Sequence, residues 1–229
     1  VEVGPDVKTL KPGDRVTSET TFATDGTCVY CQDKEYNLCP NRVGIGTKAN
    51  GSMANYVLTR EESAHILPDN VSYKMAAMSE PLASCVHAMY QKTPFTLHDT
   101  LLIMGPGPMG LLSLQIAKEI GAFVIVSGIT KDADRLQIAK ELGADIIVDT
   151  QKEDLAKVVM DATDGVGVTK VYDCSGATPA VNSALPLIRK GGTFQQVGLF
   201  AKPMNELDER SIIQHEITYR GSRSQNPYD

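Results

Sequence analysis

From residue 100 onward, short apolar runs alternate with longer segments in which apolar residues recur at the helical period. The apolar runs predict β-strands over 100–104, 123–127, 145–148, 169–174, 192–197 and 216–219. The intervening segments predict helices near 108–120, 131–142, 151–162 and 177–189. Gly121 and Gly143 close two of these helices, where a left-handed residue is needed. Strands that alternate with helices in this way indicate a doubly wound α/β fold built on a parallel sheet.

Residues 1 to about 80 follow a different pattern, rich in glycine, proline, threonine and asparagine. Residues 1–4 are strand-like, and further β-type runs at 14–17 and 52–58 are separated by turn residues. This part is therefore predicted to be mostly strand and loop. The stretch 75–92 has a helical pattern that we expect Pro81 to interrupt, and it is predicted to join the two parts.

Composition narrows the class of protein. The chain has 229 residues and is 42% hydrophobic, which suits one large domain or two modest ones, each with its own core. Its 28 acidic and 22 basic residues are well mixed and give a net charge of −6, which argues against a nucleic-acid or membrane-surface partner. No apolar run has the length of a membrane span and no leader pattern opens the chain, so the cytoplasm is the expected compartment.

A glycine-rich turn joins the predicted strand 100–104 to the helix that follows. Its six residues are Gly105, Pro106, Gly107, Pro108, Met109 and Gly110. In the order strand, turn, helix, this spacing is typical of a Rossmann dinucleotide-binding unit. Gly105 would permit the tight turn, Gly107 would let a pyrophosphate approach the backbone at the helix N-terminus, and Gly110 would let the helix pack closely on the strand. The alternative is a glycine turn that serves packing alone.

The end of the second strand bears on which dinucleotide is bound. An acidic residue about 20 positions after the motif would bind the ribose 2′-hydroxyl of NAD, but none stands there. The candidate contacts at this end are Gly128, Thr130, Lys131 and Arg135. A hydroxyl and two cations would accept a 2′-phosphate, so we expect NADP, with NAD possible. Alternatively, the two cations are solvated helix residues, and Asp132 or Asp134 reaches the ribose.

Three cysteines lie within twelve positions, a density that favours metal ligands in a reducing compartment over a disulfide framework. Cys28, Cys31 and Cys39 can close around one tetrahedral zinc if a fourth ligand is near, and Asp25 is the nearest candidate. Such a four-coordinate site would be structural, because it leaves no open position for a substrate. The alternative is a loop of free thiols without a metal.

Taken together, the motifs resemble the zinc-containing medium-chain alcohol and polyol dehydrogenase family, close to its sorbitol or iditol type. The resemblance covers the whole chain. The matching segments are 1–4, 11–16, 36–39, 51–57, 80–83, 105–110, 135–136, 142–144, 173–176, 191–192 and 197–199, together with the cysteine cluster.

The resemblance implies a partial GroES-like, mostly-β catalytic domain over 1–81, a Rossmann domain over 82–220, and a return to the catalytic domain over 221–229. It implies that Asp25 replaces the first of four zinc-binding cysteines and that Glu80 lies beside a catalytic zinc. It also implies that Val197, Gly198 and Leu199 line the nicotinamide pocket. Glu80 has a second interpretation, as a first-turn acid favoured by the helix dipole.

The family's catalytic cysteine and histidine ligands would precede residue 1, and the last helix and strands of its catalytic domain would follow residue 229. The chain is therefore expected to be truncated at both ends and to be inactive by itself. His65, His87, His98, Cys85 and Cys174 do not fall at the family's ligand positions, and we expect them to be packing or surface residues.

The implied function is hydride transfer between a small-molecule polyol or secondary alcohol and NADP or NAD, in a homo-oligomer, either a dimer or a tetramer. The alternatives are a threonine-type amino-alcohol dehydrogenase and a dinucleotide-binding chain without catalysis.

Overall fold

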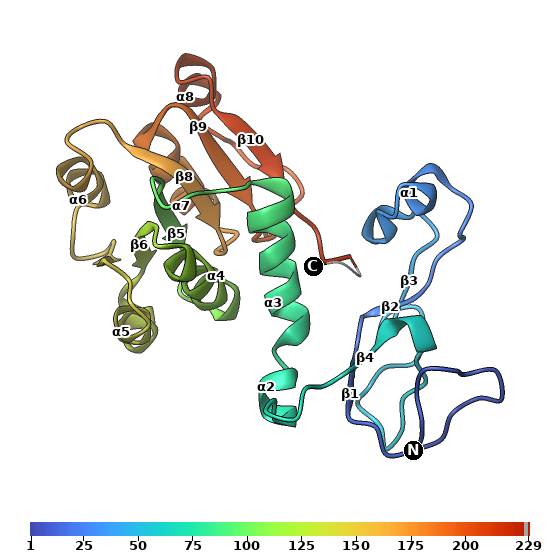
Figure 1. Cartoon of the computed structure of the whole chain (residues 1–229). Helices are drawn as coiled ribbons and strands as arrows, with labels where there is room; N and C mark the ends of the chain where they lie inside the picture. Colours follow the sequence, from blue (N-terminus) through green and yellow to red (C-terminus); the bar gives the residue numbers. More distant parts are fainter. Residues whose placement is uncertain (227–228) are drawn as a thin grey trace. The chain divides into compact units, whose positions relative to one another are not determined.

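The computed structural model describes residues 1–226 and 229, which form two compact units (Figure 1). The smaller unit comprises Val1–Ser84 and Ser224–Asp229, and the larger comprises Cys85–Arg223. No helix in the described part of the chain has both the length and the apolar character needed to cross a membrane.

The larger unit contains a parallel sheet of six strands. These are β5 (Thr100–Met104), β6 (Phe123–Gly128), β7 (Ile146–Asp149), β8 (Val168–Asp173), β9 (Ile188–Gln196) and β10 (Thr218–Gly221). Their order across the sheet is β10-β9-β8-β5-β6-β7, and every neighbouring pair is parallel. The chain therefore reverses its direction of winding between β5 and β8, as in the Rossmann fold, whose ligands bind at this reversal. The predicted α/β fold class is confirmed.

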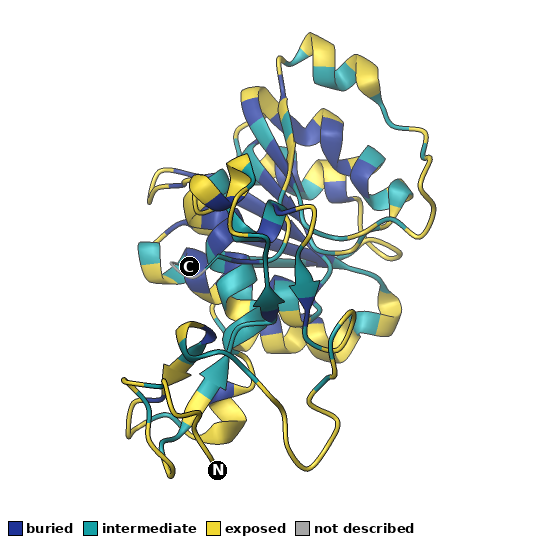
Figure 2. Ribbon diagram, turned by 90° about the vertical axis from the view of Figure 1, so that its right-hand side faces the viewer, coloured by how far each residue is buried: buried dark blue, intermediate teal, exposed yellow. Residues whose placement is uncertain are grey.

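Five helices accompany this sheet. They are α4 (Pro108–Ile120), α5 (Ala133–Glu141), α6 (Leu155–Ala162), α7 (Thr178–Ala184) and α8 (Glu209–Gln214). Leu101, Leu102 and Ile103 on β5 are fully buried, although successive side chains of a strand point to opposite faces. Leu101 and Ile103 join one apolar cluster and Leu102 joins another, so both faces of the sheet are covered (Figure 2). Burying one such side chain contributes about 1.5–3 kcal/mol, and this two-sided burial explains the continuous apolar runs in the sequence.

Several predicted boundaries in the larger unit were wrong by a few residues. The helix predicted from 151 begins at Leu155, because the Asp154 carboxylate caps it by accepting the N–H groups of Ala156 and Lys157. The helix predicted to reach 189 ends at Ala184, after which a 3-10 turn leads into β9. Gly121 and Gly143 both adopt positive φ angles, +87° and +96°, as the predicted helix ends require.

The smaller unit is built of short strands and loops. Its strands β1 (Val16–Ser18) and β4 (Ala64–Ile66) pair antiparallel, as do β2 (Thr21–Ala23) and β3 (Val43–Gly44). Its helices are α1 (Val29–Gln32), α2 (Tyr73–Ala76) and α3 (Ser79–Val86), the last of which crosses the boundary between the units. A π-helical turn, His87–Lys92, follows α3 in the larger unit.

Two local predictions for the smaller unit were wrong. Residues 1–4 and 52–58 form no strand, and all of them are exposed, because a β-type pattern by itself provides neither a partner strand nor a buried face.

The helical stretch predicted over 75–92 is interrupted near Pro81, as expected: α2 ends at Ala76, residues 77–78 form a turn, and α3 begins at Ser79. Pro81 is the third residue of α3, where its missing N–H would have no partner within the helix in any case.

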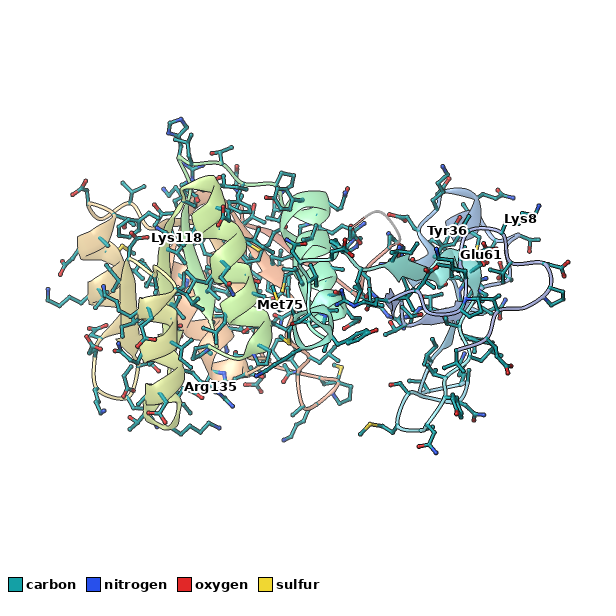
Figure 3. All side chains as sticks on the ribbon, turned by 60° about the horizontal axis from the view of Figure 1, so that its bottom comes forward. Lys8, Tyr36, Glu61, Met75, Lys118 and Arg135 are labelled. Carbon is teal, nitrogen blue, oxygen red and sulfur yellow. The ribbon has the colours of Figure 1, made fainter. Side chains whose placement is uncertain are left out.

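The loop at residues 8–9 is fixed to the rest of the smaller unit by one carboxylate. Glu61 Oε1 accepts the N–H of Lys8 at 2.8 Å and the N–H and hydroxyl of Thr9 at 2.5 Å each, and Figure 3 shows Lys8 and Glu61 side by side. The hydrogen bonds from Thr9 and Lys8 lower the pKa of Glu61.

Candidate functional site

The glycine turn leaves β5 and enters α4 with its backbone folded tightly on itself. Gly105 has φ +90°, and its N–H donates to the Ser127 carbonyl on β6 at 2.9 Å. A methyl group on Gly110 would overlap the Gly105 carbonyl oxygen, so the start of α4 can approach the turn only without a side chain there. Both glycines therefore have a structural reason for their identity.

Gly107 is different, because its environment gives no packing reason for a glycine. It is the N-cap of α4, has an extended backbone with φ −76°, and a methyl group on it would meet no atom within 4 Å. The open space lies at the N-terminus of a 13-residue helix, where backbone N–H groups and the helix dipole favour an anion. The turn thus has the shape and polarity that a pyrophosphate requires.

The other predicted cofactor residues of the larger unit lie against this turn, directly or through one intermediate loop. At the end of β6, a methyl group on Gly128 would lie 3.0 Å from the Pro106 side chain. Gly105 contacts Ser175 in the loop after β8, where a methyl group on Gly105 would lie 3.2 Å from the Ser175 Cα atom. That loop, which includes Gly176, in turn lies against residues 197–199. A methyl group on Gly176 would overlap the backbone of Leu199, and a methyl group on Gly198 would overlap the backbone of Gly176. The structure therefore brings 105–110, 128 and 197–199 together at one edge of the sheet.

A carboxylate that the sequence pattern does not single out lies beside the end of β6. Asp149, on the neighbouring strand β7, is in register with Gly128, and its two oxygens accept the Thr130 hydroxyl at 3.1 and 2.9 Å. Burial would raise the pKa of Asp149, but hydrogen bonds from Thr130, Gln151 and Lys152 outweigh it and the pKa is lowered. Parallel pairing of the second and third strands was the signal that could have found this residue.

The cations predicted at this end are exposed. Lys131 and Arg135 lie on the solvent side, Arg135 on α5 (Figure 3). Asp132 Oδ1 accepts a hydrogen bond from Arg135 at 3.3 Å, and its other oxygen accepts the N–H of Ile129 at 3.3 Å. Asp132 is therefore already engaged in the turn that starts α5.

In the smaller unit, Asp25, Cys28, Cys31 and Cys39 converge on one point. One ligand atom from each, a thiol sulfur or a carboxylate oxygen, lies within 4.8 Å of all the others. Asp25 Oδ1 accepts the N–H groups of Cys28 at 2.9 Å and Thr27 at 3.0 Å, while its Oδ2 accepts from the Asn41 amide at 2.9 Å. The hydrogen bonds from Cys28, Asn41 and Thr27 lower the pKa of Asp25.

The donor set fits zinc. Burial and the neighbouring Asp25, Cys31 and Cys39 side chains raise the pKa of Cys28 to about 11. A divalent cation would be held by the ionised carboxylate and by the thiols, which release their protons when they bind a metal. Sulfur with one oxygen is an accepted zinc environment. Cys31 and Cys39 are buried, as befits a closed structural site.

Glu80 lies elsewhere in the smaller unit, in the first turn of α3. It lines a cavity of about 220 Å³ together with Thr17, Ser18, Glu19, His65, Ser79, Ala83, Gln225, Asn226 and Asp229. Within the cavity wall, His65 Nε2 and Glu19 Oε1 are 2.9 Å apart. Glu80 is not a member of the cysteine cluster. The position of Glu80 in the first turn is equally consistent with a helix-dipole role.

The remaining histidines and cysteines lie where packing or surface roles are expected. Cys85 and His87 are buried, and His98 is exposed. Burial raises the pKa of the Cys174 thiol far above its usual range, so this thiol stays protonated.

Comparison with known proteins identifies the family. The family model for zinc-binding dehydrogenases matches residues 108–229, which is more than half of the chain. The chain belongs to the zinc-binding dehydrogenase family. The alcohol dehydrogenase GroES-like domain matches residues 1–69, in agreement with the partial GroES-like domain expected from the sequence.

Individual relatives extend this result. The chain is 72% identical to D-arabitol-phosphate dehydrogenase of Enterococcus avium and 48% identical to a sorbitol dehydrogenase of Halalkalibacterium halodurans. Both matches cover all of this chain, which spans 65% and 66% of the lengths of those proteins. A crystal structure of a Sinorhizobium meliloti protein bound to NADP matches with a TM-score of 0.91 and 30% identity, over 99% of this chain and 66% of that one.

The contrast between Gly110 and Gly107 gives a prediction about stability. Gly110→Ala is expected to lower the free energy of unfolding by about 1–3 kcal/mol, because the new methyl group must displace the Gly105 carbonyl. Gly107→Ala is the matched control and should leave the unfolding midpoint nearly unchanged, since open space surrounds that position. Urea denaturation followed by circular dichroism measures both. Equal effects of the two substitutions would contradict the different roles assigned to these glycines.

Proposed function

We propose that the protein is a zinc-dependent oxidoreductase that transfers a hydride between a polyol or secondary alcohol and NADP or NAD. The observation that carries this proposal is the turn between β5 and α4, where Gly107 leaves space for a phosphate at a helix N-terminus. The relatives named D-arabitol-phosphate dehydrogenase and sorbitol dehydrogenase favour a polyol over an amino alcohol as the substrate.

The two units would divide this work. We infer that the larger unit, Cys85–Arg223, is the Rossmann domain expected over 82–220, and that the smaller unit is the catalytic domain with a structural zinc lobe. Asp25, Cys28, Cys31 and Cys39 would hold the structural zinc, which fixes a loop with little secondary structure of its own.

The cofactor preference depends on charges at the end of β6. Gly128 supplies no carboxylate, and the cations Lys131 and Arg135 are exposed, which supports NADP. Arg135 is bonded to Asp132 at 3.3 Å and would exchange this carboxylate for a 2′-phosphate. Asp149 opposes NADP binding, because its carboxylate lies beside Thr130 at the same edge and would repel a 2′-phosphate. The Thr130 hydroxyl partly occupies that carboxylate, so we propose that NADP is preferred and NAD is accepted.

The residues of this chain would mainly bind and orient the dinucleotide. The N–H groups at the start of α4 would bind the pyrophosphate, and Val197, Gly198 and Leu199 would hold the nicotinamide end, where the exposed Leu199 side chain would pack against the bound dinucleotide. A bound dinucleotide would supply the hydride-transfer chemistry. Glu80 would act near the substrate oxygen, either as a ligand of a catalytic zinc or through its bound water, within the cavity that it lines.

The assembly and location of the protein are also proposed. We expect a homo-oligomer, either a dimer or a tetramer, formed through the larger unit, and we expect it to act in the cytoplasm on a small-molecule alcohol.

Dinucleotide binding tests the role of Gly107 directly. Gly107→Ala should weaken NADP and NAD binding at least about tenfold, because its methyl group would occupy the space through which the phosphate reaches the backbone. Gly221→Ala is the control, since a methyl group there also meets no atom within 4 Å but lies on β10. Titration of each chain by isothermal calorimetry gives the dissociation constants. Binding unaffected by Gly107→Ala would refute the phosphate site, and a preference for NAD over NADP would refute the proposed cofactor order.

Zinc analysis tests the cysteine cluster. The purified chain is expected to bind zinc at the cluster. Asp25→Asn should weaken zinc binding at least about tenfold, because the substitution removes the ligand charge. Asp33→Asn, in the same loop but exposed and outside the cluster, is the control. Competition with a chromogenic chelator measures the affinity. Unchanged affinity in Asp25→Asn would exclude this carboxylate as the fourth ligand.

Catalysis is tested on the full-length protein by supplying zinc, NADP or NAD, and a panel of polyols and polyol phosphates. Absorbance of the reduced nicotinamide should rise with at least one substrate. Glu80→Gln should lower kcat about 100-fold or more if the carboxylate takes part near the substrate oxygen. Ser79→Ala is a control from the same wall of the cavity. An absence of reduced nicotinamide with every substrate and both cofactors would reject the oxidoreductase proposal.

A further inference from the structure

A buried carboxylate joins two loops at the carboxyl edge of the sheet. Asp173, the last residue of β8, is fully buried. One of its carboxylate oxygens accepts the N–H of Ser175 at 2.9 Å and the Ser175 hydroxyl at 2.6 Å, and the other accepts the N–H of Gly176 at 3.1 Å. Its backbone carbonyl accepts the N–H groups of Val197 at 3.0 Å and Gly198 at 2.7 Å. Asp173 therefore holds the loop after β8 through its side chain and the loop after β9 through its backbone.

Gln196, the last residue of β9, connects these same loops through its side chain. Its amide nitrogen donates both to Asp173 Oδ2 and to the Gly198 carbonyl, and its amide oxygen accepts the Tyr219 hydroxyl of β10 at 2.7 Å. A glutamine can make this set of bonds because it carries a donor group and an acceptor group, whereas a glutamate would bring a second negative charge against Asp173.

Tyr219 is itself held in a fixed orientation. Its ring stacks on Phe194, with the centroids 4.8 Å apart and the planes 4° from parallel. Burial and the nearby Asp173 charge raise the pKa of Tyr219 to about 12, so its hydroxyl remains a donor at neutral pH. Tyr219 thus donates to the amide oxygen of Gln196, and the amide nitrogen of Gln196 donates to Asp173. These two hydrogen bonds fix the orientation of the Gln196 amide.

The loops held by this network lie against the glycine turn but serve different parts of the dinucleotide. The contact of Ser175 with Gly105 places them beside the phosphate turn. Residues 105–110 and 128 would bind the phosphates and the adenosine ribose, whereas residues 197–199 would bind the nicotinamide end. Leu199 is 94% exposed and has little side-chain packing of its own, so its position depends on the backbone that precedes it.

We propose that Gln196, oriented by Tyr219, is a positioning residue for the nicotinamide half of the dinucleotide. It fixes residues 197–199 relative to the glycine turn while leaving the phosphate and adenosine contacts to other residues. This inference rests on the proposed dinucleotide function. It adds a residue that would hold the backbone of the nicotinamide pocket in place without touching the nicotinamide itself.

The test compares a whole dinucleotide with the same molecule lacking nicotinamide. The full chain is titrated with NADP and with 2′-phospho-ADP-ribose, and in parallel with NAD and ADP-ribose. Gln196→Leu and Gln196→Glu should weaken dinucleotide binding about three- to tenfold and change the ADP-ribose affinities less than about twofold. Tyr219→Phe keeps the stacked ring and removes only the hydroxyl. It should therefore also weaken dinucleotide binding more than ADP-ribose binding, with a smaller effect on folding than the Gln196 substitutions.

Gln195→Leu is the matched control. Gln195 is the neighbouring residue of β9 and is fully buried, whereas Gln196 is half-buried. Gln195 is bonded to Thr93 and to the Arg220 carbonyl instead of to the two loops. Its loss should lower the unfolding midpoint without changing the ratio of dinucleotide to ADP-ribose affinity.

Each outcome bears on the proposal. Selective loss of dinucleotide affinity in the Gln196 and Tyr219 variants, but not in Gln195→Leu, supports it. Equal weakening of both ligands, or no weakening, overturns it while leaving the proposed dinucleotide function intact. If the unaltered chain binds neither ligand, the proposed function fails and the positioning role fails with it. Tyr219→Phe changes the side-chain volume little, so it tests the positioning role even if Gln196→Leu does not fold.

Discussion

The larger unit depends on backbone approaching backbone without an intervening side chain. Gly110 lies against the Gly105 carbonyl, and Gly176 and Gly198 lie against each other's loops. A methyl group at any of these positions would push apart the segments that follow β5, β8 and β9. These contacts bring the ends of strands that are distant in sequence into a single edge. That edge is closely packed except at Gly107, where open space remains for the proposed ligand.

The sheet supplies the rigid support that such an edge requires. The central strand β5 buries both of its faces, with Leu101 in one cluster and Leu102 in the other, and it pairs with β6 and β8 on either side. Buried polar groups at the strand ends, above all Asp173, are satisfied by hydrogen bonds from the loops that they hold. Apolar packing thus fixes the strands, and polar contacts at their ends fix the loops.

The two candidate metal elements differ in how they are assembled. The cysteine cluster is local, because Asp25 through Cys39 lie within one loop and close on each other with help from Asn41. Glu80 belongs to a cavity whose wall combines residues from β1, β4, α3 and residues 225, 226 and 229. A local cluster is visible as spacing in the sequence, whereas a cavity assembled from distant segments is not.

The sequence by itself determined the order of strands and helices in the larger unit, the three glycines of the turn, and the membership of the Asp25 cluster. Each of these follows from periodicity or spacing within a short window, where local sterics and burial dominate. Only the tertiary structure decided that Asp149 lies beside Thr130 and that Gln196 links Tyr219 to Asp173. It also decided that the alternating residues at 52–58 form no strand, because strand pairing and side-chain hydrogen bonds join residues whose proximity no local pattern encodes.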